Sequence, residues 1–168
     1  MSRRKSKPMT AQELLDSLAN DSAYLEMSAK KDAELAAFSA QFADEERIIS
    51  REAKALGYAV RSVWDFVNND WHSVLERRFI GPYDLAYPML TRHLKIPHHP
   101  RVREGIIRAL TARDGGELVW QALLHEFQRE KDTGLRWVLA NALKVAMPYR
   151  ERIKYPDIAH VFKHAGAL

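Results

Sequence analysis

The 168-residue sequence contains no cysteine, which excludes disulfides, thiolate metal sites and cysteine nucleophiles and fits a reducing, cytoplasmic environment. No apolar run approaches the roughly 20 residues of a bilayer-spanning helix. No apolar segment follows the basic first residues, so we expect neither membrane association nor a secretory signal. A phosphate-binding glycine loop is also missing. What is present, 46% hydrophobic residues in a chain of single-domain length, predicts a folded protein.

Positive charge exceeds negative charge by four, with 26 Lys and Arg against 22 Asp and Glu. Residues 1–9 contribute this excess, and we expect them to form a disordered basic tail. Residues 8–71 contain 6 basic and 12 acidic side chains, whereas residues 72–168 contain 16 and 10. The acidic half either neutralises the basic half within the molecule or leaves it to bind an acidic protein or a phosphate backbone.

The first part of the chain has strong helix signals. Thr10-Ala-Gln-Glu13 is a capping box that opens a short helix. Residues 23–56 are rich in Ala, Glu, Lys and Leu and lack Gly and Pro, which predicts one long helix or two helices broken near Ala43. Gly57 is expected to cap its C-terminal end, and Ser62 to begin another short helix.

The rest of the chain also has helical periodicity, and no segment shows strand alternation with hairpin turns. We therefore predict an all-α protein. The expected helices are at 71–79, 83–94, 101–111, 117–130, 135–146 and 155–163.

The regular part superimposes on itself with an offset of 33 residues, which brings Tyr87 onto Trp120. Each unit is two amphipathic helices and a tight turn, and such a hairpin cannot bury its apolar face alone. Apolar or small residues coincide at Leu90 and Leu123, Leu94 and Phe127, Val102 and Leu135, Ile106 and Leu139, Ala109 and Ala142, and Leu110 and Leu143.

These units resemble HEAT repeats. Leu85-Ala-Tyr-Pro88-Met-Leu90 is similar to a HEAT first helix, and Val102-Arg103 followed by Ala109-Leu110 is similar to a second helix. Leu135-Arg136 followed by Ala142-Leu143 repeats the second pattern. The period is shorter than the 40–47 residues of most HEAT repeats, and the chain most resembles small bacterial HEAT-repeat proteins.

The resemblance implies an α-α superhelix, a HEAT-like solenoid with an N-terminal helical capping segment. Its repeats would span 83–113 and 116–147, with a terminal helix at 154–164. Residues 10–82 would form a helical segment that packs on the repeats. Alternatively, their alanine-rich helix mediates dimerisation.

The family's usual role is protein–protein interaction, and no catalytic motif or cofactor site transfers to this chain. In a HEAT-like solenoid the second helices line the concave face, where a partner helix or acidic surface would bind. An ordinary solvated face is the alternative interpretation. The expected binding residues are Arg101, Glu104, Arg108, Arg136, Trp137, Asn141 and Lys144.

The arginine of each second helix has a structural alternative. Arg103 and Arg136 occupy the family's arginine position, where the side chain commonly pairs with a carboxylate or carbonyl between neighbouring repeats.

The histidines suggest a metal site, but the patterns are incomplete. His93, His98 and His99 cluster in the sequence, and a second pair lies four residues apart at His160 and His164. His125-Glu126 begins the H-E-x-x-H motif, but Arg129 stands where the second histidine is needed. We expect no metal site.

A second function class is nucleic-acid binding, with or without glycosylase chemistry. Some bacterial DNA glycosylases are HEAT-like solenoids with Trp and Asp in a basic channel, and this chain has Trp64-Asp65. Asp65 is also three residues from Ser62, so a capping box explains it without chemistry. The favoured interpretation is a non-enzymatic interaction module or adaptor.

Overall fold

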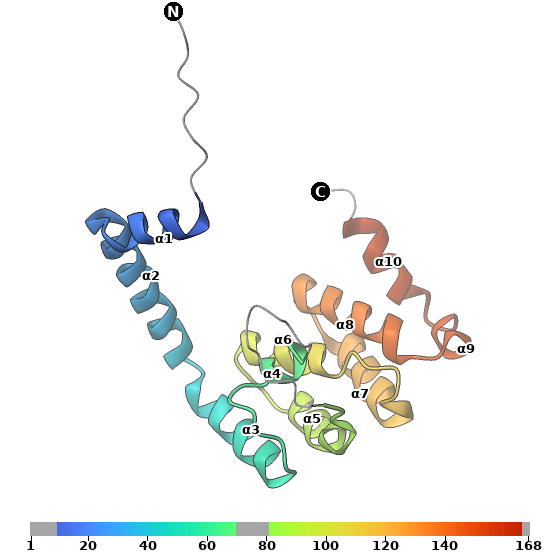
Figure 1. Ribbon diagram of the computed structural model, residues 1–168. Helices are drawn as coiled ribbons and strands as arrows, with labels where there is room; N and C mark the ends of the chain where they lie inside the picture. Colours follow the sequence, from blue (N-terminus) through green and yellow to red (C-terminus); the bar gives the residue numbers. More distant parts are fainter. Residues whose placement is uncertain (1–9, 70–80, 166–168) are drawn as a thin grey trace, which may run out of the picture. The chain divides into compact units, whose positions relative to one another are not determined.

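The structure is a computed structural model that describes residues 10–69 and 81–165 (Figure 1). Every regular element within these ranges is a helix, which confirms the all-α prediction. The tail expected at 1–9 and the helix expected at 71–79 lie outside the described residues. The chain divides into two compact units, Met1–Gln41 and Phe42–Leu168.

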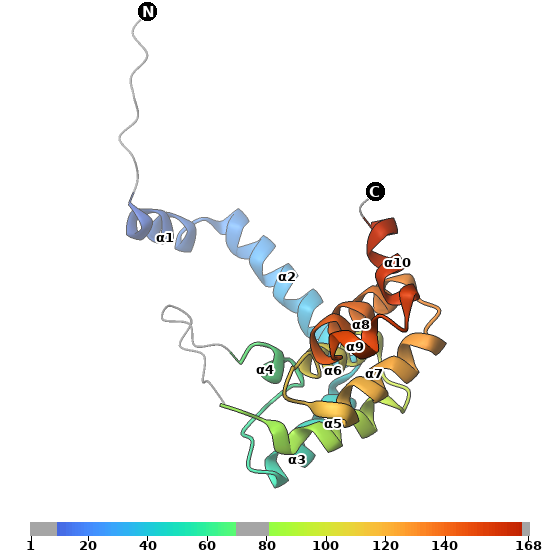
Figure 2. The same cartoon turned by 90° about the vertical axis from the view of Figure 1, so that its right-hand side faces the viewer.

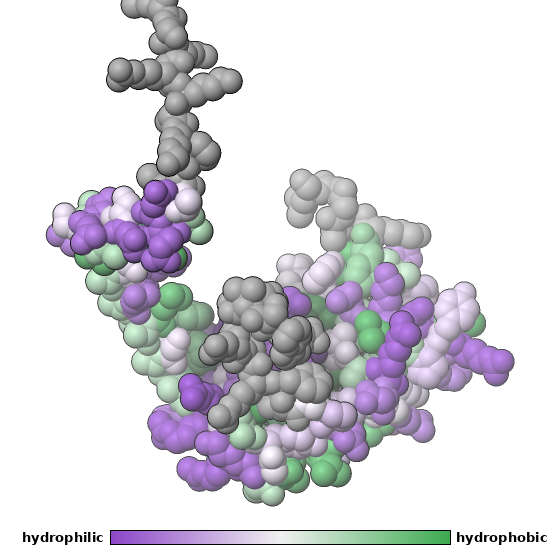
Figure 3. Space-filling model, in the orientation of Figure 1, coloured by the Kyte–Doolittle hydropathy of each residue, from purple (hydrophilic) through white to green (hydrophobic). Residues whose placement is uncertain are grey.

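The first unit contains helices α1 (Ala11–Ala19) and α2 (Ser22–Ala40). The predicted capping box opens α1, because the Thr10 hydroxyl accepts the Glu13 N–H and the Glu13 carboxylate accepts the Thr10 N–H. Asp21 caps α2 with its carboxylate, which accepts the N–H groups of Ala23 and Tyr24. Neither helix contains a buried residue within the described unit, and Figure 3 shows apolar side chains on the surface of α2.

The second unit contains α3 to α10, whose helices contact one another in two series. The contacts of one series run from α3 to α5 and then to α7, and those of the other run from α4 to α6, α8 and α10. Figure 2 shows α3 and α5 along the lower side, with α8 and α10 above them. The elements are α3 (Ala43–Ala55), α4 (Trp64–Val67), the 3-10 helix η1 (Asp84–Ala86), α5 (Tyr87–Leu94), α6 (Pro100–Ala109), α7 (Gly116–Arg129), α8 (Thr133–Ala146), α9 (Tyr149–Arg152) and α10 (Pro156–Ala165).

The core of this unit lies between the two series, and the residues paired by the 33-residue offset share it. Leu90 and Leu123 are fully buried at equivalent positions of α5 and α7. The pairs in α6 and α8 behave in the same way, although Leu135 is only partly buried where Val102 is fully buried. Equivalent sequence positions therefore have equivalent places in the core. The fully buried pairs in α6 and α8 are Ile106 and Leu139, Ala109 and Ala142, and Leu110 and Leu143.

Helix ends follow local chemistry that the sequence displays. Gly57 has φ +94° after α3, as the predicted glycine cap requires, and the Tyr58 N–H donates to the Ala53 carbonyl. The His99 ring caps α6, whose first residue is a proline, and the Asp132 carboxylate caps α8 through the Leu135 N–H. Turns between paired helices are therefore short and defined.

Two contacts fix the short helix α4. Glu46 of α3 is buried, and its carboxylate accepts the Val63 N–H at 2.7 Å and the Ser62 hydroxyl at 2.9 Å. On the other side α4 approaches α6 at Gly105, where a Cβ atom would stand 2.5 Å from Val63 Cγ1. A glycine is therefore required in the middle of α6 for these helices to touch.

The structure confirms one of the two predictions for the alanine-rich segment and differs from the sequence expectation at two other helices. The alanine-rich segment forms two helices with a break at Gln41–Phe42, which confirms the second of the two predictions for this segment. The helix expected from residue 83 begins as η1 and becomes α-helical at Tyr87, immediately before Pro88. Helix α9 was not predicted, because one turn between two prolines is too short to show periodicity.

Shortening a buried leucine in the seam between the two series tests its role in stability. We expect Leu90→Ala and Leu123→Ala each to lower the free energy of unfolding by about 2–5 kcal/mol, because each leaves a cavity among fully buried neighbours. Leu118→Ala is the control, since Leu118 lies on α7 but is half exposed, and its cost should stay within about 0.5 kcal/mol. Urea unfolding measures all three. A cost for Leu118→Ala as large as those for Leu90→Ala and Leu123→Ala would contradict the role of the buried seam.

Candidate interaction surface

Three of the predicted binding residues are joined on α6. The Glu104 carboxylate accepts a 2.7 Å hydrogen bond from Arg108 Nε and lies 3.9 Å from an Arg101 nitrogen. The Arg101 guanidinium stacks over the Trp64 ring, 3.7 Å from its centroid. A single carboxylate thus spaces two cations, and Arg101 links α6 to α4 through a cation–π contact.

Two of the predicted residues on α8 meet at α10. Trp137 is 38% exposed, and its ring approaches Phe162 edge-on with centroids 6.3 Å apart. Lys144 Nζ lies 5.3 Å from the centre of the same Phe162 ring. Asn141 lies between them on α8, half-buried. The α8 part of the surface therefore has an aromatic centre with a cation beside it.

The two parts are continuous because α6 and α8 pack side by side. The 33-residue offset brings Glu104 onto Trp137 and Arg108 onto Asn141, so these residues hold equivalent positions on neighbouring helices. We call Arg101, Glu104, Arg108, Trp137, Asn141 and Lys144 the α6–α8 face. It contains three cations and one carboxylate.

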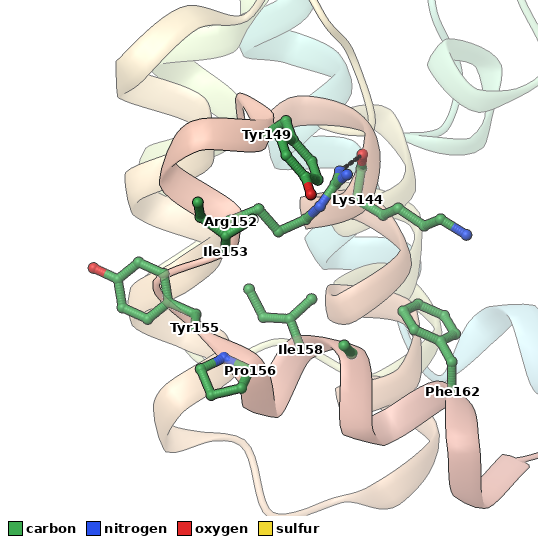
Figure 4. A pocket seen from close by; sticks show the side chains of 9 residues that line it. Lys144, Tyr149, Arg152, Ile153, Tyr155, Pro156, Ile158 and Phe162 are labelled. Atoms are coloured by element: carbon green, nitrogen blue, oxygen red, sulfur yellow. Dashed lines mark hydrogen bonds between the residues drawn. The ribbon is translucent and has the colours of Figure 1, made fainter.

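An apolar pocket of about 480 Å³ adjoins this face at Lys144 and Phe162 (Figure 4). Its walls come from α8, α9 and α10. Two of the lining residues, Tyr149 and Ile153, are more than half exposed. The Arg152 guanidinium crosses it to donate to the Lys144 carbonyl. The remaining lining residues are Tyr155, Pro156, Ile158 and Ala159.

Sequence reasoning missed this pocket because it missed α9. The available signal was the spacing of Tyr149 and Ile153, four residues apart after Pro148. Two exposed apolar side chains on one side of a single helical turn have nothing to pack against within that turn, so they indicate an apolar surface. The pocket's aromatic wall, Phe162, was placed in the terminal helix but was not given a role.

Arg136 lies apart from the face. Its guanidinium donates to the Phe127 carbonyl at 2.8 Å and lies over the Phe127 ring, 4.2 Å from the centroid. Arg103 does the same one repeat earlier, donating to the Leu94 carbonyl at 3.1 Å. Each arginine therefore reaches nine residues back to a carbonyl at the end of its hairpin's first helix.

Arg103 also links the two hairpins. It lies 2.9 Å from Glu126 and 3.3 Å from Glu130, both mostly buried on α7 and its C-terminal end. Burial alone raises the pKa of Glu126, but the hydrogen bonds and charges of Arg103 and His125 outweigh it, so this pKa is below its ordinary value. Arg103 thus pairs with carboxylates of the neighbouring hairpin, as the resemblance implied, whereas Arg136 pairs with carbonyls of its own hairpin.

Within the described residues, 10–69 and 81–165, no group of three or more His, Asp or Glu side chains is placed so that it could hold a metal ion. His125 pairs with the adjacent Glu126 at 2.9 Å. His93 and His98 contact each other, and they contact two glutamates of α3, Glu52 and Glu45.

The Asp65 carboxylate has a local role. It accepts the N–H groups of Arg61 at 2.6 Å and Ser62 at 3.2 Å, and the Ser62 hydroxyl accepts the Trp64 N–H. Asp65 thus makes one of the two bonds of the capping box that the spacing suggested as the alternative to catalysis, while the Asp65 N–H donates to the Ser62 carbonyl and not to its hydroxyl. The adjoining Trp64 ring lies against Gly105 and under Arg101.

No protein-family model, curated protein or solved structure matches this chain. Among the described helices, none combines the length and the apolarity that a membrane span requires.

Removing each arginine compares the link between hairpins, which Arg103 makes, with a bond inside one hairpin, which Arg136 makes. We expect Arg103→Met to cost about 2–4 kcal/mol of unfolding free energy, because it leaves the Leu94 carbonyl and two mostly buried carboxylates without their cation. Arg136→Met leaves carbonyls only and should cost about 1–2 kcal/mol.

The same variants have different pH dependences. Because the folded pKa of Glu126 is lowered, its stabilising contribution is present above the ordinary carboxylate value and is lost as pH falls through the folded value. The cost of Arg103→Met should therefore shrink between about pH 7 and pH 3. Urea unfolding at both pH values measures this, and a cost that does not change would refute the pairing.

Proposed function

We propose that this chain is a non-enzymatic protein-interaction module that binds its partner on the α6–α8 face. The observation that supports this most is the continuity of three cations with an exposed tryptophan and an apolar pocket. Interfaces of this kind combine a buried apolar anchor with a polar rim, and they are enriched in Trp and Arg. The proposed partner segment is an acidic helix whose apolar side chain enters the pocket while its carboxylates face Arg101, Arg108 and Lys144.

The proposed architecture behind this function is a HEAT-like solenoid. It is supported by the two series of helix contacts, by the equivalent burial of residues 33 positions apart and by the repeated arginine–carbonyl bond. In such an architecture the second helices, here α6 and α8, form one face that is free to bind. The N-terminal segment would cap the first repeat, where α3 and α4 already contact α5 and α6.

The pairing of the other arginines supports binding by these particular cations. Arg92, Arg103 and Arg136 are engaged by carboxylates or backbone carbonyls, so their charge is satisfied within the fold. Arg101 and Lys144 lie over aromatic rings with side chains open to solvent, and the Glu104 carboxylate comes no closer to Arg101 than 3.9 Å. A partner's carboxylate can therefore approach these cations while they stay on their rings.

Charge reversal on the face provides the test. The full-length tagged chain captures proteins from a cell lysate, and the captured proteins are identified by mass spectrometry and remeasured with purified components. We expect Arg108→Glu with Lys144→Glu to weaken the purified complex about tenfold or more, because both rim charges become repulsive to an acidic partner. The control, Arg129→Glu with Lys131→Glu, makes the same charge change at exposed positions at the C-terminal end of α7 and in the turn after it.

A second variant separates the pocket from the rim. Ile153→Ser removes part of the apolar wall at a residue that is 61% exposed, so it should leave stability unchanged. The association rate of the purified complex should also stay the same, while its dissociation rate rises. If the purified partner binds the wild type, the control, the charge-reversal variant and Ile153→Ser equally well, this surface is not the binding site.

Nucleic-acid binding is the alternative function, motivated by the basic balance of residues 72–168. It requires affinity for duplex or single-stranded DNA that falls steeply with salt concentration. Fluorescence anisotropy with labelled oligonucleotides at low salt distinguishes the two classes, since binding there would replace the protein-partner proposal and its absence would remove the alternative.

A further inference from the structure

The first unit begins with a segment that is both acidic and apolar, residues 10–29, which we call the acidic arm. It contains four carboxylates and no Lys or Arg. Leu14, Leu15 and Met27 are each at least half exposed, and neither helix of the first unit contains a buried residue. Exposed apolar side chains gathered on so short a segment indicate a surface that another molecule covers.

The carboxylates of the arm have no cation of their own. Glu13 and Asp21 accept backbone N–H groups at the starts of α1 and α2, and Asp16 accepts a hydrogen bond from the Gln12 side chain. Among the described residues, neither these three carboxylates nor Glu26 forms a salt bridge with a Lys or Arg. Their negative charge is therefore available to a cationic surface.

The α6–α8 face has the complementary chemistry. It carries three cations and one carboxylate, and the apolar pocket beside it has two lining residues, Tyr149 and Ile153, that are more than half exposed. Arg101 and Lys144 lie over aromatic rings and can meet a carboxylate without leaving them. An acidic helix that presents leucine side chains fits such a face, because its apolar anchors enter the pocket while its charges meet the rim.

Charge indicates which surface covers the arm. Two arms placed against each other would bring two sets of four carboxylates together without a cation, which is repulsive. Residues 42–168 contain 20 basic and 16 acidic side chains, so the second unit attracts the arm. Residues 30–40 continue α2 as a helix about 16 Å long, which gives the arm the reach to contact a second chain.

We propose that the acidic arm of one copy binds the α6–α8 face of a second copy, with Leu14 and Leu15 at the apolar pocket. This inference rests on the proposed function, because it uses the same face and names a second copy of the chain as its occupant. Each chain has one arm and one face, so a two-fold symmetric pair makes the contact twice. Any other partner of the face then competes with the arm.

Sedimentation velocity of the full-length chain measures the self-association. We expect a monomer–dimer equilibrium that moves towards dimer as the chain concentration rises. Because the contact joins exposed charges, it should move back towards monomer as the salt concentration is raised from about 0.05 M to about 0.5 M. A wild type that is monomeric at every concentration, or a dimer that salt does not weaken, would overturn the proposal.

Charge reversal on either side of the contact should break the dimer. The arm variant is Asp16→Lys with Glu26→Lys, which leaves the carboxylates that cap α1 and α2 in place. The face variant is Arg108→Glu with Lys144→Glu. We expect each variant to weaken the dimer about tenfold or more, because like charges then face each other.

Matched controls make the same charge changes outside the contact. Asp32→Lys with Glu34→Lys lies on α2 beyond the arm, and Arg129→Glu with Lys131→Glu lies outside the α6–α8 face. Both should dimerise as the wild type does. Controls that lose the dimer as fully as the arm and face variants would show that total charge, and not the arm–face contact, governs the association.

Mixing the arm variant with the face variant tests whether the contact joins two chains. In a mixed pair the acidic arm meets the cationic face, and the reversed arm meets the reversed face, so both contacts are attractive. Two variants that are monomeric alone should therefore form a dimer together. If they remain monomeric when mixed while the wild type dimerises, the arm does not bind the face of a second copy.

The partner complex of the preceding section shows which of the two proposals fails. If the wild type is monomeric but the face variant weakens its complex with the purified partner, self-association is overturned and the proposed function stands. If the dimer depends on both arm and face but the partner binds every variant equally well, the self-association stands and the proposed site for the other partner is rejected.

Discussion

The burial of one apolar seam between two series of helices is the constraint on which the second unit depends. A single hairpin such as α5–α6 has an apolar side that it cannot cover by itself. Contact with α7 and α8 covers it, and Leu90, Leu123, Ile106 and Leu139 become fully inaccessible together. At about 25 cal/mol per Å² of apolar surface, this burial is the largest stabilising term available to so small a unit. The polar contacts described above select the arrangement of helices rather than supply most of its stability.

Much of this arrangement was visible in the sequence, because the pattern that signals it is local. The offset of 33 residues pairs the core positions correctly, and the capping box at Thr10 and the glycine at 57 are formed as predicted. At Ser62 only half of the expected box is formed, because Asp65 accepts the Ser62 N–H but the Ser62 hydroxyl accepts the Trp64 N–H. Helix periodicity is repeated over many residues, so small local exceptions do not hide it. A four-residue helix such as α9 has no such repetition, and the pocket that depends on it was therefore not foreseen.

The candidate surface was predicted less completely, since position on a helix does not reveal which partner a long side chain takes. Arg136 and Arg108 are both cations of second helices. One turns to backbone carbonyls, and the other lies beside Glu104 on the open face. The contacts of His93 and His98 show the same limit. These histidines are five residues apart, but the two glutamates that they contact are more than 40 positions away and meet them only when α3 packs on α5. Contacts of this kind come from tertiary structure, and no spacing rule reports them.

The repeated bond from Arg103 to Leu94 and from Arg136 to Phe127 fixes the number of residues in the bend of each hairpin. A guanidinium reaches only a fixed distance, so the bend between the two helices of each hairpin has no freedom to gain or lose residues. In the connection between the two hairpins the tie comes instead from a hydroxyl, because Tyr87 donates to the Asp114 carboxylate at 2.8 Å. A change in chain length within the bends at 95–99 or 130–132 would therefore break the arginine–carbonyl bond of that hairpin.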